Sequence, residues 1–248
     1  MVFISDLDDT IIFSEKKIKG KRVCVEKKDG KGISFMTDRG AELFAETVKN
    51  VMFVPITTRS LEQYGRIEFP EGYKPQYAIV DNGAVLLTDG LIDKEWSERS
   101  EKIAADCHSE LEEFKIKLEK IVENSSVVRH SDNIFIYTKH TNCNYLMKKL
   151  LSAAEPEKVS VFIGGNKLYV IPKEINKKSA FENLKRKFQN EIIVAAGDSE
   201  LDKDFLAEAD IALIKCGVLS GRRINKNQIC ERVPDNDFVF EIVKKYLN

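Results

Sequence analysis

The sequence of 248 residues has no long apolar run and no excess of charge of either sign. No stretch approaches the roughly 18 apolar residues that a membrane-spanning helix needs, so we expect no membrane partner. Lys and Arg number 39 and Asp and Glu number 40, which gives a formal net charge of −1. Because no strong field of one sign is present to attract a polyanion, we expect a small-molecule partner and no nucleic acid.

Cysteine and histidine are also sparse and scattered. The five cysteines are an odd number and form no Cys-x-x-Cys pair, and the three histidines share no spacing typical of metal ligands. This pattern argues against a disulfide framework or a zinc site and predicts reduced thiols. An acidic cluster close to the start leaves no room for a signal peptide. We therefore expect a cytoplasmic protein, either a monomer or a small homo-oligomer.

Short apolar segments alternate with helical patterns along the chain. Five segments are apolar throughout and rich in β-branched residues, as buried parallel strands are: 2–5, 52–57, 77–80, 191–197 and 210–214. A helical pattern with Thr37 as its candidate N-cap lies between the first two. The alternation predicts an α/β fold with a doubly wound, Rossmann-like parallel sheet. Pro55 lacks the N–H of a central strand, so we expect a local irregularity there.

The character of the sequence changes in its middle third, which predicts a smaller α+β domain inserted into the first. One long charged helix, two strands, a second helix and a hairpin that turns near Gly164 and Gly165 give an α-β-β-α-β-β order. We expect the core domain to comprise 1–85 and 172–248, and the inserted domain to comprise 86–171.

A separate hairpin is expected in the core domain, at "RVCVEKKDGKGISF". The strands should turn at Asp29 and Gly30, a pair that favours a tight hairpin turn. The segment from 16 to 28 is strongly basic and would attract an anion, but a solvated hairpin is the simpler interpretation.

Three carboxylates, Asp6, Asp8 and Asp9, follow the first predicted strand directly. Open α/β sheets build their ligand sites at the carboxyl ends of strands. Residues two apart in an extended segment point the same way, so Asp6 and Asp8 can face one cavity. Such a pair suits a divalent cation and nucleophilic or acid–base chemistry on a phosphate. An Asp-rich turn explains this segment equally well when it is taken alone.

Three further segments place polar residues at strand ends or helix starts. They are "PITTRS" with Thr57, "INKKSA" with Lys177, and "AAGDSELD" with Asp198 and Asp202. Together with "DLDDT", and in this order, they resemble the four motifs of the haloacid dehalogenase-like phosphatase superfamily. The insert lies between the second and third motifs, and "VDNGAV" precedes it, which is similar to the Cof-type and sucrose-phosphatase-like branch. In that branch the inserted domain is an α+β cap.

The resemblance implies a role for each motif residue. Asp6 matches the nucleophile that forms an aspartyl-phosphate, and Asp8 matches the acid–base that serves both half-reactions. Thr57 would donate a hydrogen bond to a phosphoryl oxygen. Lys177 would supply a positive charge that offsets the carboxylates and the transferring phosphoryl group.

The resemblance also implies a bound Mg²⁺. Its ligands would be Asp6, Asp198 and the backbone carbonyl of Asp8, with Asp202 orienting a neighbouring group or a water. The cation and Lys177 would make the crowding of carboxylates tolerable.

The sequence departs from the family pattern at two positions. Leu201 stands where Cof-type relatives usually have Asn, and Thr58 stands where Gly is common. Lys178 and Lys173 lie close to Lys177 in the sequence and are alternatives to it. Arg59 suits either a substrate contact or a salt bridge at a helix start.

The sequence thus predicts a Mg²⁺-dependent phosphatase for a small phosphorylated metabolite, with a sugar or polyol phosphate favoured. A phosphosugar mutase with the same aspartyl-phosphate chemistry is the first alternative, and a non-catalytic phosphometabolite-binding protein is the second. A binding protein should have lost an essential carboxylate, and none is lost here.

Overall fold

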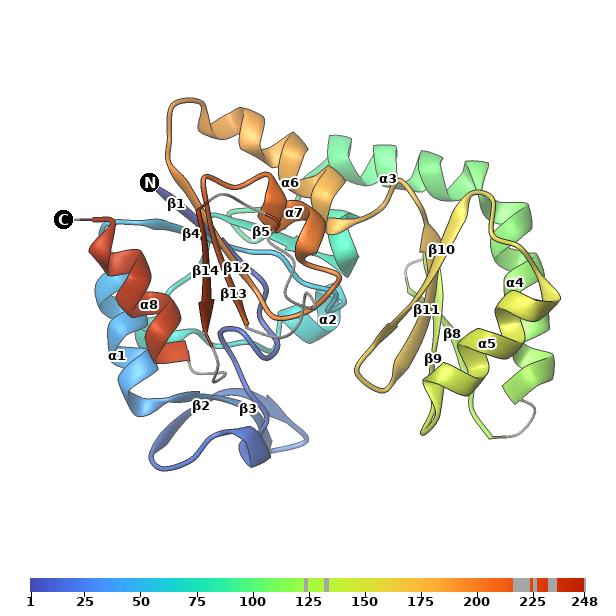
Figure 1. The fold of residues 1–248 in the computed structure, drawn as a ribbon, viewed down its shortest axis with the longest axis horizontal. Coiled ribbons are helices and arrows are strands. Elements are labelled where there is room, and N and C mark those ends of the chain that lie inside the picture. Colours follow the sequence, from blue (N-terminus) through green and yellow to red (C-terminus); the bar gives the residue numbers. More distant parts are fainter. Residues whose placement is uncertain (123–124, 132–133, 216–223, 225–226, 232–235, 248) are drawn as a thin grey trace. The chain divides into compact units, whose positions relative to one another are not determined.

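The computed structural model describes residues 1–122, 125–131, 134–215, 224, 227–231 and 236–247. The chain forms two compact units (Figure 1). Unit 1 comprises Met1–Asp93 and Lys177–Asn248, and unit 2 comprises Lys94–Asn176. The chain therefore leaves unit 1 once and returns once, and both junctions lie a few residues later than the sequence analysis placed them.

Unit 1 contains a five-stranded parallel sheet in the order β14-β13-β12-β1-β4. The strands are β1 (Val2–Ser5), β4 (Met52–Pro55), β12 (Ile193–Gly197), β13 (Ile211–Lys215) and β14 (Gln228–Glu231). The first four correspond to expected strands, and β14 was not expected. The predicted α/β class with a central parallel sheet is confirmed.

Helices cover both faces of this sheet (Figure 1). On one face lie α1 (Asp38–Thr47) and α8 (Asn236–Lys245), and on the other lie α6 (Lys177–Lys185) and α7 (Lys203–Ala207). Thr37 caps α1 as predicted, because its side chain accepts a hydrogen bond from the Gly40 N–H at 2.8 Å. Alternate strand residues such as Phe3 and Phe53 pack with Phe44 of α1 and Phe240 of α8, where aromatic rings meet edge to face.

The expected parallel strand at 77–80 forms, but most of its pairing is antiparallel. β5 (Tyr77–Val80) pairs with β6 (Val85–Thr88), which pairs with β7 (Leu91–Ile92). The "DNG" turn between β5 and β6 makes this possible, since Asp81, Asn82 and Gly83 all have positive φ. This small sheet keeps the chain in unit 1 as far as Asp93, which is why the first junction lies later than expected.

Pro55 fits in β4 because its backbone nitrogen, which carries no hydrogen, points away from β1. The Ile56 N–H donates to the Ser5 carbonyl of β1, and the nitrogen of the preceding residue, Pro55, therefore points to the opposite side of the strand. On that opposite side lies β5, and the backbone hydrogen bond to it comes from Thr57, whose N–H donates to the Ile79 carbonyl at 2.9 Å. The proline therefore removes no hydrogen bond of the five-stranded sheet.

The basic hairpin forms from β2 (Arg22–Lys28) and β3 (Lys31–Thr37) and turns at Asp29 and Gly30, both with positive φ. The basic side chains of the hairpin are exposed to solvent, as a solvated hairpin predicts, but some of its other side chains are not. The pairing register shifts around Glu26, and this bulge buries both Val25 and Glu26. The remaining short elements of unit 1 are η1 (Glu15–Lys17), α2 (Leu61–Tyr64), η2 (Pro70–Gly72), η3 (Asp81–Gly83) and η4 (Arg186–Phe188).

Unit 2 is an antiparallel sheet in the order β10-β11-β9-β8, with α4 and α5 packed on one face. Its elements are α3 (Lys94–Asp106), α4 (His108–Val122), β8 (Val128–Ser131), β9 (Phe135–Lys139), α5 (Cys143–Ala153), β10 (Val159–Gly164) and β11 (Lys167–Pro172). The long charged helix expected at its start is two helices. The break falls at Cys107, whose side chain is buried in the core of unit 2.

In the part of the chain that the structure describes, no helix is long and apolar enough to cross a membrane. Cys24, Cys107 and Cys143 carry free thiols. The compartment and the oligomeric state stay predictions.

Candidate active site

The candidate site lies where two neighbouring parallel strands end. Asp6 follows β1 and Asp198 follows β12, and the Asp6 N–H donates to the Ala196 carbonyl at 2.9 Å. From β1 the chain goes to β4 on one side and later to β12 on the other, so β1 marks the switch point of the sheet. Ligands of open α/β sheets bind at this point, outside the carboxyl ends of the strands.

Lys177 is the first residue of α6, and its ammonium lies between two carboxylates. Nζ donates to Asp6 Oδ1 and to Asp202 Oδ1, each at 2.6 Å. The side chains of Lys177, Asp6 and Asp202 are 2%, 8% and 0% exposed, respectively, so the ion pairs are shielded from water. The structure thus joins Asp6 to Lys177, 171 positions away in the sequence, and Lys177 to Asp202, a further 25 positions along the chain.

The two alternative lysines lie elsewhere. Lys178 is 41% exposed and pairs with Glu208 at 3.0 Å. Lys173, in unit 2, donates to the backbone carbonyls of Pro156 and Glu157. Neither lysine contacts the acidic cluster through a hydrogen bond or an ion pair that the described residues make.

The electrostatics of the cluster follow from burial and crowding. Burial raises the pKa of Asp6 well above its ordinary value, and Lys177 opposes this effect while Asp202, Asp198 and Asp8 add to it. Burial alone would lower the pKa of Lys177, but Asp202 and Asp6 outweigh it and raise that pKa. Lys177 is therefore a permanent positive charge inside the cluster.

The loop after β12 holds Asp202 in place. Its Oδ2 accepts hydrogen bonds from the Ser199 N–H at 3.0 Å, from Ser199 Oγ at 2.7 Å and from the Asp198 N–H at 3.2 Å. The close approach requires Gly197, because a Cβ at that position would lie 2.5 Å from the Cβ of Asp202. Leu201 is only partly buried in this loop.

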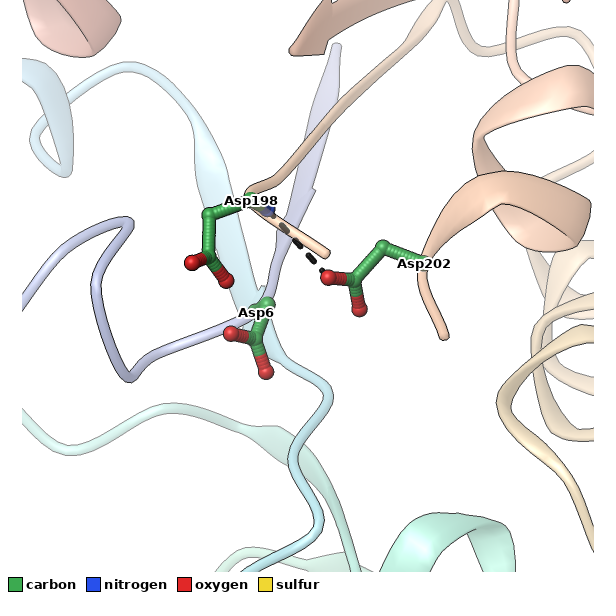
Figure 2. Close-up of side chains that lie close together, drawn as sticks. All are labelled: Asp6, Asp198 and Asp202. Atoms are coloured by element: carbon green, nitrogen blue, oxygen red, sulfur yellow. Dashed lines mark hydrogen bonds between the residues drawn. The ribbon is translucent and has the colours of Figure 1, made fainter. Parts of the chain in front are cut away.

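The carboxylates of Asp6, Asp198 and Asp202 converge (Figure 2), and one oxygen of each lies within 4.8 Å of the other two. Carboxylate oxygens are the ligands that Mg²⁺ prefers, so this donor set fits the ion that the motifs imply. Both oxygens of Asp202 already accept hydrogen bonds, which favours Asp6 and Asp198 as direct ligands. The side chain of Asp8 lies outside the cluster.

The side chain of Asp8 is bound by Arg59. Arg59 Nε donates to Asp8 Oδ2 at 2.7 Å, and Nη2 donates to Asp8 Oδ1 at 2.8 Å. The sequence suits Arg59 either to a substrate contact or to a salt bridge at a helix start, and the structure has the salt bridge. Asp8 could not be predicted as the partner, because no local pattern connects residues 51 positions apart.

Thr57 lies on the loop that follows β4 and is fully buried. Its Oγ1 accepts a hydrogen bond from the Arg59 N–H at 3.1 Å, which leaves the hydroxyl hydrogen to be donated. The "DNG" turn fixes this loop, since the Asn82 N–H donates to the Thr57 carbonyl and the Asp81 N–H donates to the Arg59 carbonyl. Thr58 has no positive φ, so the glycine usual at its position is not required here.

Comparison with known proteins identifies the family of the chain. Residues 1–217 match the sequence model of the family described as Sucrose-6F-phosphate phosphohydrolase. A phosphoglycolate phosphatase of Methanobrevibacter smithii is 25% identical over 174 residues, which cover 68% of this chain and 73% of that protein.

Solved structures share the fold at low sequence identity. The sucrose-phosphatase of Synechocystis sp. PCC6803, solved with sucrose and phosphate, superposes with a TM-score of 0.63 at 16% identity, covering 99% of this chain and 97% of that one. A haloacid dehalogenase-like hydrolase of B. subtilis superposes with a TM-score of 0.60 at 15% identity, covering 98% and 99%. The chain therefore belongs to the sucrose-6F-phosphate phosphohydrolase family of haloacid dehalogenase-like phosphatases.

Proposed function

We propose that this phosphatase hydrolyses a small phosphorylated metabolite, with a sugar or polyol phosphate favoured, through an aspartyl-phosphate at Asp6. The observation that carries the proposal is the buried ammonium of Lys177, which donates to both Asp6 and Asp202 at 2.6 Å. A fixed positive charge beside a buried carboxylate is what attack on an anionic phosphoryl group requires, because it offsets the repulsion between the two anions. The named phosphatases among its relatives support the substrate class.

In the first half-reaction, one oxygen of the Asp6 carboxylate attacks phosphorus and the bond from phosphorus to the substrate oxygen breaks. Asp8 gives its proton to the departing alkoxide, which would otherwise be a poor leaving group. The Thr57 hydroxyl donates to a phosphoryl oxygen and Lys177 balances the charge that collects there.

In the second half-reaction, water attacks the phosphorus of the aspartyl-phosphate and the bond between phosphorus and Asp6 breaks. Asp8, now a carboxylate, takes the proton from that water and returns to its starting state. Inorganic phosphate leaves, and Asp6 is restored as a carboxylate.

Asp6 and Asp198, with the Asp8 backbone carbonyl, would hold Mg²⁺, and Asp202 would keep their loop in place. When bound, the ion would neutralise part of the charge on the phosphoryl oxygens and orient the group for in-line attack.

A screen of phosphorylated metabolites for phosphate release tests the proposal, with turnover run in ¹⁸O-labelled water. A phosphatase should place the label in released phosphate and need no activator. A mutase should require a sugar bisphosphate and move the phosphoryl group between sugar positions faster than phosphate appears, which would overturn the proposal. No phosphate release from any substrate, despite phosphometabolite binding, would favour the non-catalytic alternative.

A further inference from the structure

Glu26 is an unusual residue for its position. It is an acidic residue in a basic hairpin strand, yet its side chain is 1% exposed. The register of β2 and β3 shifts on both sides of Glu26, so the bulge turns this carboxylate inward instead of toward solvent. Burial of a charged group is costly unless it is paired and hydrogen-bonded, so the contacts of Glu26 should have a purpose.

Two arginines and a serine surround the Glu26 carboxylate. Arg59 Nη1 donates to Oε2 at 2.7 Å, and Ser34 Oγ donates to the same oxygen at 2.5 Å. Arg66 Nε donates to Oε1 at 3.1 Å. Arg59 Nη2 also donates to Ser34 Oγ at 3.1 Å, which closes a ring of hydrogen bonds around its guanidinium.

The other edge of the Arg59 guanidinium holds Asp8. Its Nε and Nη2 donate to the two oxygens of Asp8 at 2.7 and 2.8 Å, while Nη1 is held by Glu26. The Arg59 side chain is 11% exposed and the Asp8 side chain 53%, so the arginine is the fixed partner and the carboxylate the accessible one. The Asp81 N–H donates a hydrogen bond to the Arg59 backbone carbonyl at 2.7 Å, which holds the Arg59 backbone in place.

We propose that Arg59, anchored by Glu26, is a positioning residue that fixes the Asp8 carboxylate in the orientation needed for proton transfer. The inference rests on the proposed function, because it assigns Asp8 the acid–base role. A planar guanidinium with two parallel N–H donors fixes both the place and the plane of a carboxylate, which a lysine does not do.

The pairing is compatible with proton transfer by Asp8. A carboxylate has about four lone-pair sites, and the two bonds from Arg59 use one on each oxygen. A proton can therefore be carried on Asp8 while Arg59 still holds it. General acid catalysis needs the proton within hydrogen-bond reach of the leaving oxygen, so freedom of the Asp8 side chain to rotate would reduce the rate.

The test compares kcat/KM for two substrates with different leaving groups. An alkyl phosphate from the substrate screen needs protonation as it leaves, whereas 4-nitrophenyl phosphate does not. Arg59→Gln should lower kcat/KM for the alkyl phosphate by about 100-fold and for the aryl phosphate by less than about tenfold. Arg59→Lys, which keeps the charge but not the two parallel bonds, should show the same selective loss to a smaller degree.

Arg66→Gln is the matched control. Arg66 pairs with the same Glu26 carboxylate, and among the residues that the structure describes it makes no hydrogen bond or ion pair with Asp8, so this variant disturbs the buried network without releasing the acid–base. It should lower stability and leave the ratio of the two kcat/KM values unchanged. Glu26→Gln keeps the shape of the anchor, serves if Arg59→Gln does not fold, and should reduce the alkyl phosphate rate selectively.

A folded Arg59→Gln variant that loses both activities equally, or neither, would overturn the positioning role. So would a change in the ratio for Arg66→Gln as large as that for Arg59→Gln, because the effect would then be general to the network. In the Asp8→Asn background, Arg59→Gln should cause no further selective loss, since the group it positions is already gone. Absence of phosphatase turnover in the unmodified protein would overturn the proposed function itself, which is a distinguishable result.

Discussion

Replacing Lys177 with methionine removes the charge at the centre of the acidic cluster while keeping a side chain of similar length. At an effective dielectric constant of about 20, a unit charge 2.6 Å from its partner is attracted by about 6 kcal/mol, before the cost of desolvation is subtracted. Lys177 makes two such contacts in a buried setting. Removal of one partner from a buried ion pair costs about 3–5 kcal/mol, because the remaining charges are left uncompensated. We expect Lys177→Met to lower the free energy of unfolding by that amount.

The assay is urea unfolding followed by far-ultraviolet circular dichroism, in the presence of a chelator. Fluorescence is less suitable, because the single tryptophan, Trp96, lies in unit 2. Added Mg²⁺ should restore part of the lost stability, since a cation bound to Asp6 and Asp198 replaces some of the missing charge. The kcat should fall by about 100-fold or more, as when an electrostatic stabiliser is removed from an active site.

Lys178→Met is the matched control, one residue further along the same helix. Its side chain is 41% exposed, and its ion pairs with the described residues are to the partly exposed carboxylates of Glu182 and Glu208, so stability should change by less than about 1 kcal/mol and kcat should stay the same. Equal effects of the two substitutions on stability and on kcat would refute the reasoning, because they would show that Lys177 contributes no more than a solvated lysine.

Asp6→Asn keeps the size of the side chain but removes the attacking charge, so kcat should fall by about a thousandfold or more while the fold persists; substantial phosphate release by the folded variant would exclude Asp6 as the nucleophile. Excess chelator should abolish phosphate release and Mg²⁺ should restore it, whereas Ca²⁺, which accepts more ligands, should inhibit; full turnover in chelator would remove the metal from the mechanism. Gly197→Ala places a Cβ 2.5 Å from Asp202 Cβ, and we expect a loss of about 1–3 kcal/mol in urea unfolding together with a lower kcat; a variant with unchanged stability would show that the loop shifts at no cost.

Much of the fold follows from local patterns that tertiary contacts do not override. The Asp29 and Gly30 pair predicted a hairpin turn, and both residues adopt the positive φ that such a turn needs. Short β-branched runs predicted four strands of the parallel sheet. The resemblance to the haloacid dehalogenase-like motifs implied that Asp6 and Asp198 share one site, and the structure brings them together because neighbouring parallel strands end at the same edge of the sheet.

The features that were missed depend on contacts between distant residues, or on a bulge that changes which side chains of a strand point inward. Cys107 carries no helix-breaking signal such as proline, and the break there accompanies its burial in the unit 2 core. Glu26 sits in a strand whose alternation predicts solvent exposure, but the bulge shifts the phase and buries it. Its link through Arg59 to Asp8 joins three segments of the chain, and no spacing rule covers such a network.

The central claim, that Asp6 carries the phosphoryl group, is tested most directly by trapping the covalent intermediate. In Asp8→Asn, a nitrophenolate still leaves without help, but no base activates water, so the phosphorylated protein should accumulate. Incubation with 4-nitrophenyl phosphate should release one nitrophenolate per active site in a burst, and acid quench, digestion and mass spectrometry should locate one phosphoryl group on the peptide that contains Asp6. A stoichiometric burst with the phosphoryl group on any other peptide, or steady turnover with no phosphorylated protein, would contradict the account.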